Sequence, residues 1–352
     1  MKIKLAILEN DKSYLNRIVS VFSTKYSDKF QIYSFTNMEL AIETVHNEKI
    51  DILIANDYFE IDTDRIPARC SFAYFVNNLD VEVVNNQKAI CKFQKAELIY
   101  KQILSIYSEN AGSLSGLKLT DDCKVTMFSS PCGGVGTTTV AAAYSLYLTK
   151  KGNKTLFLSF DCFDSTDIFF SGDGQATISD LIFALKSKKS NLAMKMESYV
   201  KRDYADVYFF SKAKYPLDML ELKSDEKMFL LEELKSFGSY DNIVVDLSFG
   251  VDKEHLDFYK KAHDVIMVSD GSLIANEKIR NAYSTLLMLD NNQDIPVANR
   301  VSLMYNRFSS KTGIMLDYQE LRSIGGAPVF TQATVRQIME HLSQSDAFEK
   351  LN

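Results

Sequence analysis

Short runs of isoleucine, valine and leucine alternate along the chain with longer segments in which apolar residues recur every three or four positions. Such runs are typical of buried strands, and such segments are typical of amphipathic helices. Because strands and helices alternate, the pattern predicts an α/β fold with mostly parallel sheets flanked by helices. In the first part of the chain we expect a five-strand open sheet, with strands at 3–8, 31–35, 52–55, 73–76 and 88–92 and helices at about 13–25, 38–46 and 95–107.

A change of composition divides the chain. The stretch SENAGSLSGLKLTDDC, residues 108–123, is rich in serine, glycine and aspartate and has no apolar period, as in a linker. We therefore predict a first domain at 1–108, a linker at 109–122 and a second domain at 123–352. For the second domain we expect strands at 124–130, 155–160, 207–210, 242–245, 265–269, 301–305 and 329–330.

Composition and charge exclude several classes of protein. Hydrophobic residues make up 46% of the 352 residues, enough for two packed cores without disulfides. The net charge of −6 gives no general attraction to nucleic acid, and none is expected as a partner. The five cysteines form no CxxC pair, which favours a reducing, cytoplasmic location. No apolar run approaches the ~20 residues of a membrane span, although peripheral association with the inner face of a membrane stays open.

A glycine-rich loop is the clearest chemical signal in the sequence. The apolar run KVTMFSS leads into PCGGVGTTT and then into the helical segment VAAAYSLYLTKK. This order of strand, loop and helix is that of phosphate-binding sites, in which backbone N–H groups and the helix N-terminus face the anion. The complete P-loop pattern has a lysine after its last glycine, but Thr137 and then Thr138 follow Gly136 here. A structural tight turn is the alternative explanation of this loop.

Two aspartates at predicted strand ends strengthen the phosphate-site interpretation. Asp246 ends YDNIVVD, where an acidic partner of Mg²⁺ lies in P-loop proteins. Asp161 ends TLFLSFD, the place expected for a carboxylate near the γ-phosphate. The glycine loop and the two strand-end aspartates together favour a phosphate-binding site over a purely structural turn.

These segments resemble the MinD/ParA class of P-loop ATPases, whose deviant Walker A loop is normally written KGGVGKTT. The resemblance covers about residues 122–345 and is closest to the pilus-assembly branch, TadZ and CpaE, because of TISDLIFAL, VYFFSKAKYPLDMLE and HDVIMVSDGSLIANEKIRNAYSTL. It implies ATP and Mg²⁺ as ligands, a homodimer that buries the nucleotides, Mg²⁺ bound by Thr138 and Asp246, and a catalytic role for Asp161. It also implies that the nucleotide is bound by Cys132, Gly133, Gly134, Val135, Gly136, Thr137, Thr138, Thr139 and Asn306, the last at the adenine. A plain strand cap is the alternative role for Asn306.

The departures from the class pattern are as informative as the matches. The class has a lysine early in the loop that reaches the partner subunit's phosphates, and this sequence has Cys132 there. Thr137 replaces the second lysine. Since such cations stabilise the charge that develops during phosphoryl transfer, we expect ATP binding with weak or absent hydrolysis.

The first domain resembles a response-regulator receiver with an altered acceptor site. Glu9, Asn10 and Asp11 retain part of the acidic group after the first strand, and Lys92 matches the expected lysine. Asn56 stands at the phospho-acceptor position, where an amide cannot accept a phosphoryl group. Asn77 or Asn78 replaces the expected hydroxyl residue, and Asp57 serves as an acceptor only after a one-residue shift of register. We expect a non-phosphorylated scaffold domain.

The leading functional hypothesis is a nucleotide-dependent localisation or assembly factor for a Tad-type pilus or secretion system, located at a cell pole or at the membrane face. The expected partners are a second copy of the chain and pilus or secretion assembly proteins. The alternative is an active MinD/ParA-type partitioning or positioning ATPase. The basic segment 186–202 is interpreted as a solvated helix with a buried methionine face rather than as a lipid-binding or partner-binding patch.

Overall fold

A computed structural model describes residues 2–110, 123–187, 191–236, 239–290, 296–318 and 320–351. The expected linker, 109–122, lies outside these residues apart from its first two positions. The chain divides into two compact units. One unit contains Met1–Ser115 together with Lys186–Ser198, and the other contains Gly116–Leu185 together with Tyr199–Asn352.

Within the described residues, the first unit has a six-stranded sheet in the order β2-β1-β3-β4-β6-β5. All neighbouring strands are parallel except β5, which pairs antiparallel with β6. This sixth strand was not expected; Asn85 and Asn86 turn the hairpin with positive φ angles, which asparagine tolerates. The elements are β1 (Ile3–Leu8), α1 (Lys12–Lys25), β2 (Phe30–Phe35), α2 (Met38–Asn47), β3 (Ile52–Asn56), β4 (Ser71–Val76), β5 (Val83–Val84), β6 (Gln87–Cys91) and α3 (Ala96–Asn110).

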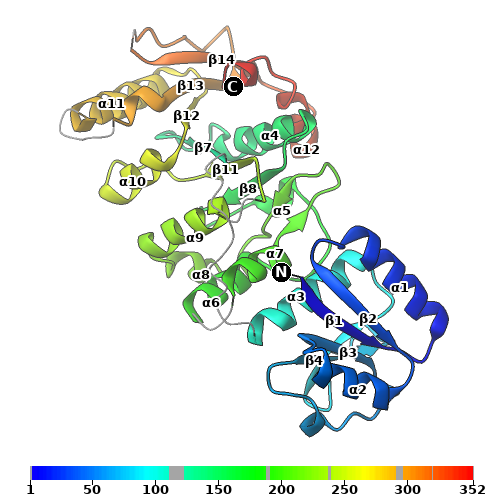
Figure 1. The fold of residues 1–352 in the computed structure, drawn as a ribbon. Coiled ribbons are helices and arrows are strands. Elements are labelled where there is room, and N and C mark those ends of the chain that lie inside the picture. Colours follow the sequence, from blue (N-terminus) through cyan, green and yellow to red (C-terminus); the bar gives the residue numbers. More distant parts are fainter. Residues whose placement is uncertain are drawn as a thin grey trace. The chain divides into compact units, whose positions relative to one another are not determined.

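Helices cover the two faces of this sheet because side chains alternate along β1. Leu5 and Ile7 belong to the core formed with α1 and α3, whereas Ala6 and Leu8 belong to the core formed with α2. Figure 1 shows α1 and α2 on opposite faces of the sheet. The residues between β3 and β4, all described, carry a short 3-10 turn at Thr63–Arg65 in place of a helix.

A helix from the basic segment belongs to this first unit. Residues 192–198 of α7 (Leu192–Tyr199) and Asn191, the position before the helix, lie within Lys186–Ser198. Met194 packs against the core of α1 and α3. The helix has the expected methionine on its buried face, since Met196 is buried. Lys195 is buried as well, whereas the basic residues of this segment were expected to be exposed to solvent.

Within the described residues, the second unit has an eight-stranded sheet in the order β14-β13-β12-β7-β11-β8-β10-β9. Only the β9–β10 pair is antiparallel. The two α/β domains predicted from the sequence are confirmed. The elements are β7 (Lys124–Ser129), α4 (Thr137–Lys150), β8 (Thr155–Ser159), α5 (Thr166–Phe169), α6 (Ile178–Ser187), β9 (Lys201–Arg202), β10 (Tyr208–Phe209), α8 (Pro216–Leu220), α9 (Ser224–Ser236), β11 (Asn242–Asp246), α10 (Lys253–Lys261), β12 (Asp264–Ser269), α11 (Leu273–Asp290), β13 (Val301–Phe308), β14 (Arg322–Pro328) and α12 (Val335–Leu342).

The last strand differs from the sequence prediction. A strand was expected at 329–330, but β14 spans Arg322–Pro328 and ends before those residues. Its sequence, RSIGGAP, has little β-propensity. A Cβ at Gly326 would collide with the backbone of Tyr305, so glycine permits the close approach of β14 to β13 and explains a strand without the usual residues.

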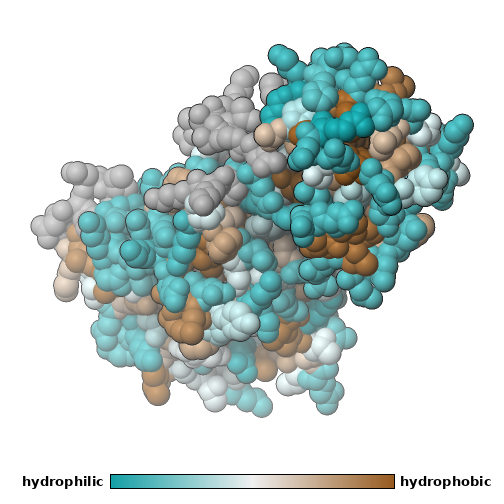
Figure 2. Space-filling view, turned by 90° about the horizontal axis from the view of Figure 1, so that it is seen from below, coloured by the Kyte–Doolittle hydropathy of each residue, from teal (hydrophilic) through white to brown (hydrophobic). Residues whose placement is uncertain are grey.

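The surface carries apolar side chains in separate groups. On the face drawn in Figure 2, apolar residues form several patches between hydrophilic ones. Among the residues that the structure describes, no helix is both long and apolar enough to cross a membrane.

Candidate functional site

The predicted phosphate loop lies at the carboxyl edge of the second sheet. Strand β7 lies between β12 and β11, and β11 lies between β7 and β8. In this register Asp246 is opposite both Phe128, near the end of β7, and Ser159, at the end of β8. The loop, Asp246 and Asp161 therefore meet at the edge where open α/β sheets bind ligands.

Two of the three loop glycines use the conformational freedom of glycine. Gly134 and Gly136 have φ angles of 77° and 84°, whereas Gly133 has no positive φ. Gly136 is the N-cap of α4, so no side chain caps the first N–H groups of this helix. These groups and the helix dipole are available to an anion.

Cys132 is held away from the centre of the loop. Its backbone N–H donates to Ser130 Oγ at 3.0 Å, and Ser130 Oγ donates to the carbonyl of Val268 at 2.6 Å. The Cys132 thiol is buried and donates to the carbonyl of Ala275, in α11, at 3.5 Å. Burial raises the pKa of the Cys132 thiol, so at neutral pH it brings no charge to the site.

Asn306 and Arg307 connect β13 to the phosphate loop. The buried Asn306 side chain donates from Nδ2 to the carbonyl of Val135 at 2.8 Å. Arg307 donates from Nη1 to the carbonyl of Gly134 at 3.0 Å and has a φ of 58°, a strained value for arginine. The two side chains therefore hold the loop at Gly134 and Val135. A Cβ at Gly136 would lie 2.5 Å from Asn306 Nδ2, so glycine is needed for this close approach.

Thr138 and Asp246, the predicted Mg²⁺ ligands, lie close enough to interact. Burial raises the pKa of Asp246 to about 7, and the negative charges of Asp161 and Asp164 raise it further. The Thr138 side chain opposes this rise. Asp246 is thus a buried carboxylate whose charged neighbours have the same sign.

Such a carboxylate fits a site for a divalent cation. Mg²⁺ in nucleotide sites is usually held by one or two protein oxygens together with phosphate oxygens and water, rather than by a complete protein cage. Among the described residues, no group of three or more histidine, cysteine, aspartate or glutamate side chains is arranged to hold a metal. The oxygens of Thr138 and Asp246 are the donors that would hold Mg²⁺ beside a bound triphosphate.

The segment after β8 contributes two further carboxylates. Asp161 accepts a hydrogen bond from the backbone N–H of Phe163 at 3.1 Å, which keeps it in a tight turn. Asp164 accepts from both the backbone N–H and the hydroxyl of Thr166, at 2.9 and 2.6 Å. Burial raises the pKa of Asp164. Both aspartates act electrostatically on Asp246.

The sequence prediction missed Ser130, Asp164 and Arg307. Asp164 follows Asp161 by three residues and Arg307 follows Asn306 directly, so proximity to the predicted residues was the available signal. Nothing local to Ser130 indicates that it bonds to Val268, 138 positions away.

In the first unit, the position of the receiver acceptor is closed by side chains of the chain itself. The Asn56 amide donates from Nδ2 to both carboxylate oxygens of Glu9, at 3.0 and 2.9 Å. Lys92 Nζ lies 3.2 Å from the same carboxylate, and all three residues are buried. Glu9 therefore supplies the negative charge that Lys92 pairs with.

The other acidic residues near the acceptor position have separate roles. Asp11 caps α1 by accepting from the backbone N–H groups of Ser13 and Tyr14, and the bond from Tyr14 is the main cause of its lowered pKa. Asp57 is exposed and lies just beyond the end of β3. Asn77 and Asn78 are exposed after β4.

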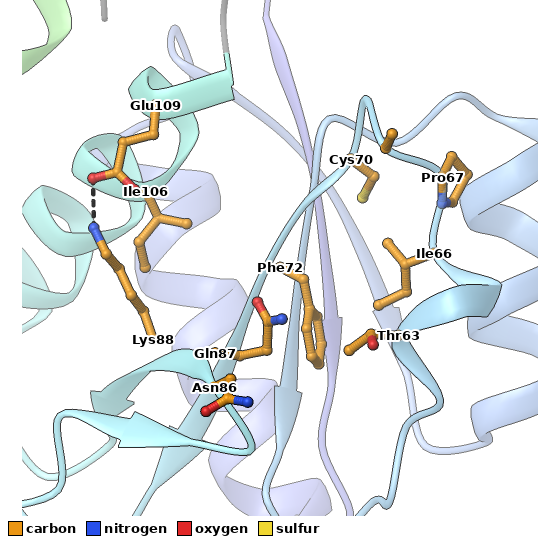
Figure 3. Close-up of a pocket in the computed structure, with 11 residues that line it drawn as sticks. Thr63, Ile66, Pro67, Cys70, Phe72, Asn86, Gln87, Lys88, Ile106 and Glu109 are labelled. Atoms are coloured by element: carbon orange, nitrogen blue, oxygen red, sulfur yellow. Dashed lines mark hydrogen bonds and ion pairs between the residues drawn. The ribbon is translucent and has the colours of Figure 1, made fainter. Parts of the chain in front are cut away.

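The first unit also contains a pocket of about 370 Å³. Figure 3 shows Phe72 and Ile66 at this pocket and the ion pair between Lys88 and Glu109 at its side. It lies toward the amino ends of β4 and β6, whereas Asn56 is at the carboxyl end of β3. The pocket is therefore separate from the acceptor position.

Comparison with known proteins agrees with both units. Residues 1–108 match the family model of the TadZ-like receiver domain. A ParA family ATPase from Chlorobium tepidum TLS superimposes with a TM-score of 0.51 at 17% identity, over 65% of this chain and 96% of that chain. The MinD cell division protein of Aquifex aeolicus superimposes with a TM-score of 0.50, also at 17% identity and with the same two coverages.

No curated protein matches the sequence. The structural matches, at these identities, establish the fold of the second unit, and the family model establishes the nature of the first. The chain therefore combines a TadZ-like receiver domain, residues 1–108, with a second domain that has the fold of the MinD and ParA ATPases.

Proposed function

We propose that this protein is an ATP- and Mg²⁺-binding localisation or assembly factor of a Tad-type pilus or secretion system, and that it acts as a nucleotide-stabilised dimer with weak or no hydrolysis. The observation that carries the proposal is that the loop combines intact phosphate- and Mg²⁺-binding features with the loss of both lysines. The glycine cradle and the Thr138–Asp246 pair are present, but Cys132 and Thr137 replace the two lysines.

The residues have distinct roles in this proposal. Backbone N–H groups of Gly133–Thr139 and the N-terminus of α4 hold the phosphates. Thr138 and Asp246 hold Mg²⁺, which offsets the repulsion between the triphosphate and the aspartates of the site. Asn306 and Arg307 fix the loop from the side of β13, where the adenine is proposed to bind.

Weak hydrolysis follows from the charge of the loop. Phosphoryl transfer is accelerated mainly by cations placed where negative charge develops. Cys132 is uncharged and faces α11, and Arg307 bonds to a loop carbonyl. Asp161 remains as a carboxylate for orienting water, but the loop offers no lysine beside it.

Apolar surface beside the loop supports a dimer that does not depend on the missing lysine. Leu273 and Ile274, at the start of α11, are 72% and 73% exposed, and they directly precede Ala275, whose carbonyl binds the Cys132 thiol. Ile314 and Met315 are also exposed, and the N–H of Ile314 bonds to the carbonyl of Gly271. Burial of four such side chains against a second copy would stabilise a dimer.

The assignment to pilus assembly rests on the TadZ-like receiver domain. With the acceptor position closed by Glu9, Asn56 and Lys92, this domain is proposed to dock onto a pilus or secretion component rather than to receive a phosphoryl group. A location at the inner membrane face or at a pole would come from that partner.

Sedimentation analysis with and without ATP–Mg²⁺, combined with a turnover assay, tests the proposal. We expect a dimer that requires both ATP and Mg²⁺ and is lost in Ile274→Glu, while that variant still binds ATP. The exposed Phe229→Glu, on α9, is the matched control and should still dimerise. A monomer under saturating ATP–Mg²⁺ would eliminate the dimer, and rapid turnover would favour the alternative, an active MinD/ParA-type positioning ATPase.

A further inference from the structure

Helix α7 is bound to the receiver by polar contacts as well as by Met194. The backbone N–H of Asn191, just before the helix, donates to the carbonyl of Ser108 at 3.3 Å. In the sequence, α7 lies between α6 and β9, both elements of the second unit. The receiver fold therefore includes a helix that the neighbouring domain's chain supplies.

Lys195 makes the most extensive of these contacts. Its side chain is 6% exposed, and Nζ lies 3.0 Å from the carbonyl and 3.1 Å from the hydroxyl of Ser105. Nζ also lies 3.1 Å from Glu109 Oε1, near the end of α3. A buried lysine is tolerated only where such partners replace water, so this docking is specific.

Glu197 makes a second set of contacts with the receiver. It accepts from the Tyr100 hydroxyl, in α3, at 2.6 Å and from Lys29 Nζ at 3.0 Å. Tyr100 in turn stacks on Tyr26 with ring centroids 4.0 Å apart. Glu197 thereby connects α7 to α3 and to the turn after α1.

Within the second unit, hydrogen bonds connect the phosphate site to the chain that follows α7. Asp164, which acts on Asp246, bonds to Thr166 at the start of α5. Two residues after α5, the N–H of Ser171 donates to the buried Asp203 at 2.8 Å, directly after β9. A Cβ at Gly172 would lie 2.7 Å from the carbonyl of Arg202, so the two segments are in close contact.

We propose that α7 transmits the nucleotide state of the phosphate site to the receiver domain, through α5, Asp203 and β9, and so regulates the stability of α3. The inference rests on the proposed binding of ATP–Mg²⁺. A nucleotide that moves the Asp161–Asp164 segment displaces Ser171 and its partner Asp203, and β9 is joined to α7 by a single residue. Because α7 is anchored on α3 at two charged positions, its displacement changes the opening equilibrium of α3.

Hydrogen exchange of the full chain, with and without ATP and Mg²⁺, tests this inference. In the wild type we expect slower exchange in residues 133–139 and a change of about twofold or more in residues 96–110. Glu197→Gln and the milder Tyr100→Phe should retain the effect in the loop and lose the effect in α3. Glu43→Gln, an exposed substitution on α2, should retain both.

The outcomes separate this inference from the proposed function. Slowed exchange in the loop with no change in α3, or a change in α3 that Glu197→Gln and Tyr100→Phe leave intact, would overturn the role of α7 while nucleotide binding stands. No effect of ATP–Mg²⁺ on the loop would overturn nucleotide binding, and the inference with it. The affinity for ATP is a second readout. If α7 couples the two domains, Glu197→Gln must change this affinity, by about fivefold for a coupling free energy of 1 kcal/mol.

Discussion

Replacing Asp246 by asparagine is expected to stabilise the protein without nucleotide while removing its response to ATP–Mg²⁺. Asp246 is buried beside Thr138, and its pKa is raised from 3.8 to about 7. The folded state therefore binds a proton more tightly than the unfolded state does. Ionised Asp246 destabilises the fold, and asparagine retains an oxygen that can accept from Thr138 without carrying the charge.

The sign and the magnitude follow from linkage. Below pH 3.8 Asp246 is protonated in both states and has no effect on the free energy of unfolding. Between that value and about 7 the unfolded state loses its proton first, so the wild type becomes less stable as the pH rises. Above about pH 7 the loss is complete, and at about 1.4 kcal/mol per pKa unit it reaches at most about 4 kcal/mol.

Thermal unfolding at pH 8 and pH 4 measures this effect. We expect Asp246→Asn to raise the Tm by several degrees at pH 8 and much less at pH 4. ATP–Mg²⁺ at a hundredfold excess over Kd should add about 2.7 kcal/mol to the wild type and little to the variant. Asp167→Asn, an exposed change nearby, is the control and should do neither. A lower Tm of Asp246→Asn at pH 8, or an equal rise at both pH values, would refute the reasoning.

Three further predictions concern the two candidate sites. Gly136→Ala should weaken ATP binding and destabilise the domain by about 2–3 kcal/mol, because the new Cβ meets Asn306 at a positive φ; Gly152→Ala, also at positive φ but with no atom within 4 Å, should leave binding intact. Thr137→Lys should lower the Kd for ATP in titrations by restoring the loop cation, and an unchanged Kd would contradict this. Acetyl phosphate should leave the intact mass of the protein unchanged, because Asn56 holds the acceptor position; stable addition of phosphate to Asp57 would disprove it.

Local patterns in the sequence were sufficient for the architecture. The alternation of apolar runs and helical periods predicted two α/β domains, and most strands lie within two residues of the expected limits, since buried parallel strands have a clear signature. The failures were β14, whose glycines serve packing against Tyr305, and β5 and β9, which have two residues each. In all three, the strand depends on a partner rather than on its own residues.

The contacts that define the sites were decided by the tertiary structure. Asn306 and Val135 are 171 positions apart, and Glu9 and Lys92 are 83 apart. The sequence by itself determined which residues are proposed to carry chemistry: the glycine loop, the two strand-end aspartates, and an asparagine in place of an acceptor. It did not determine that Asn56 and Lys92 bind Glu9, that the Cys132 thiol faces α11, or that Lys195 is buried against α3. Propensity and periodicity act over a few residues. These partners are brought together by strand order and register, which no short segment of the sequence determines.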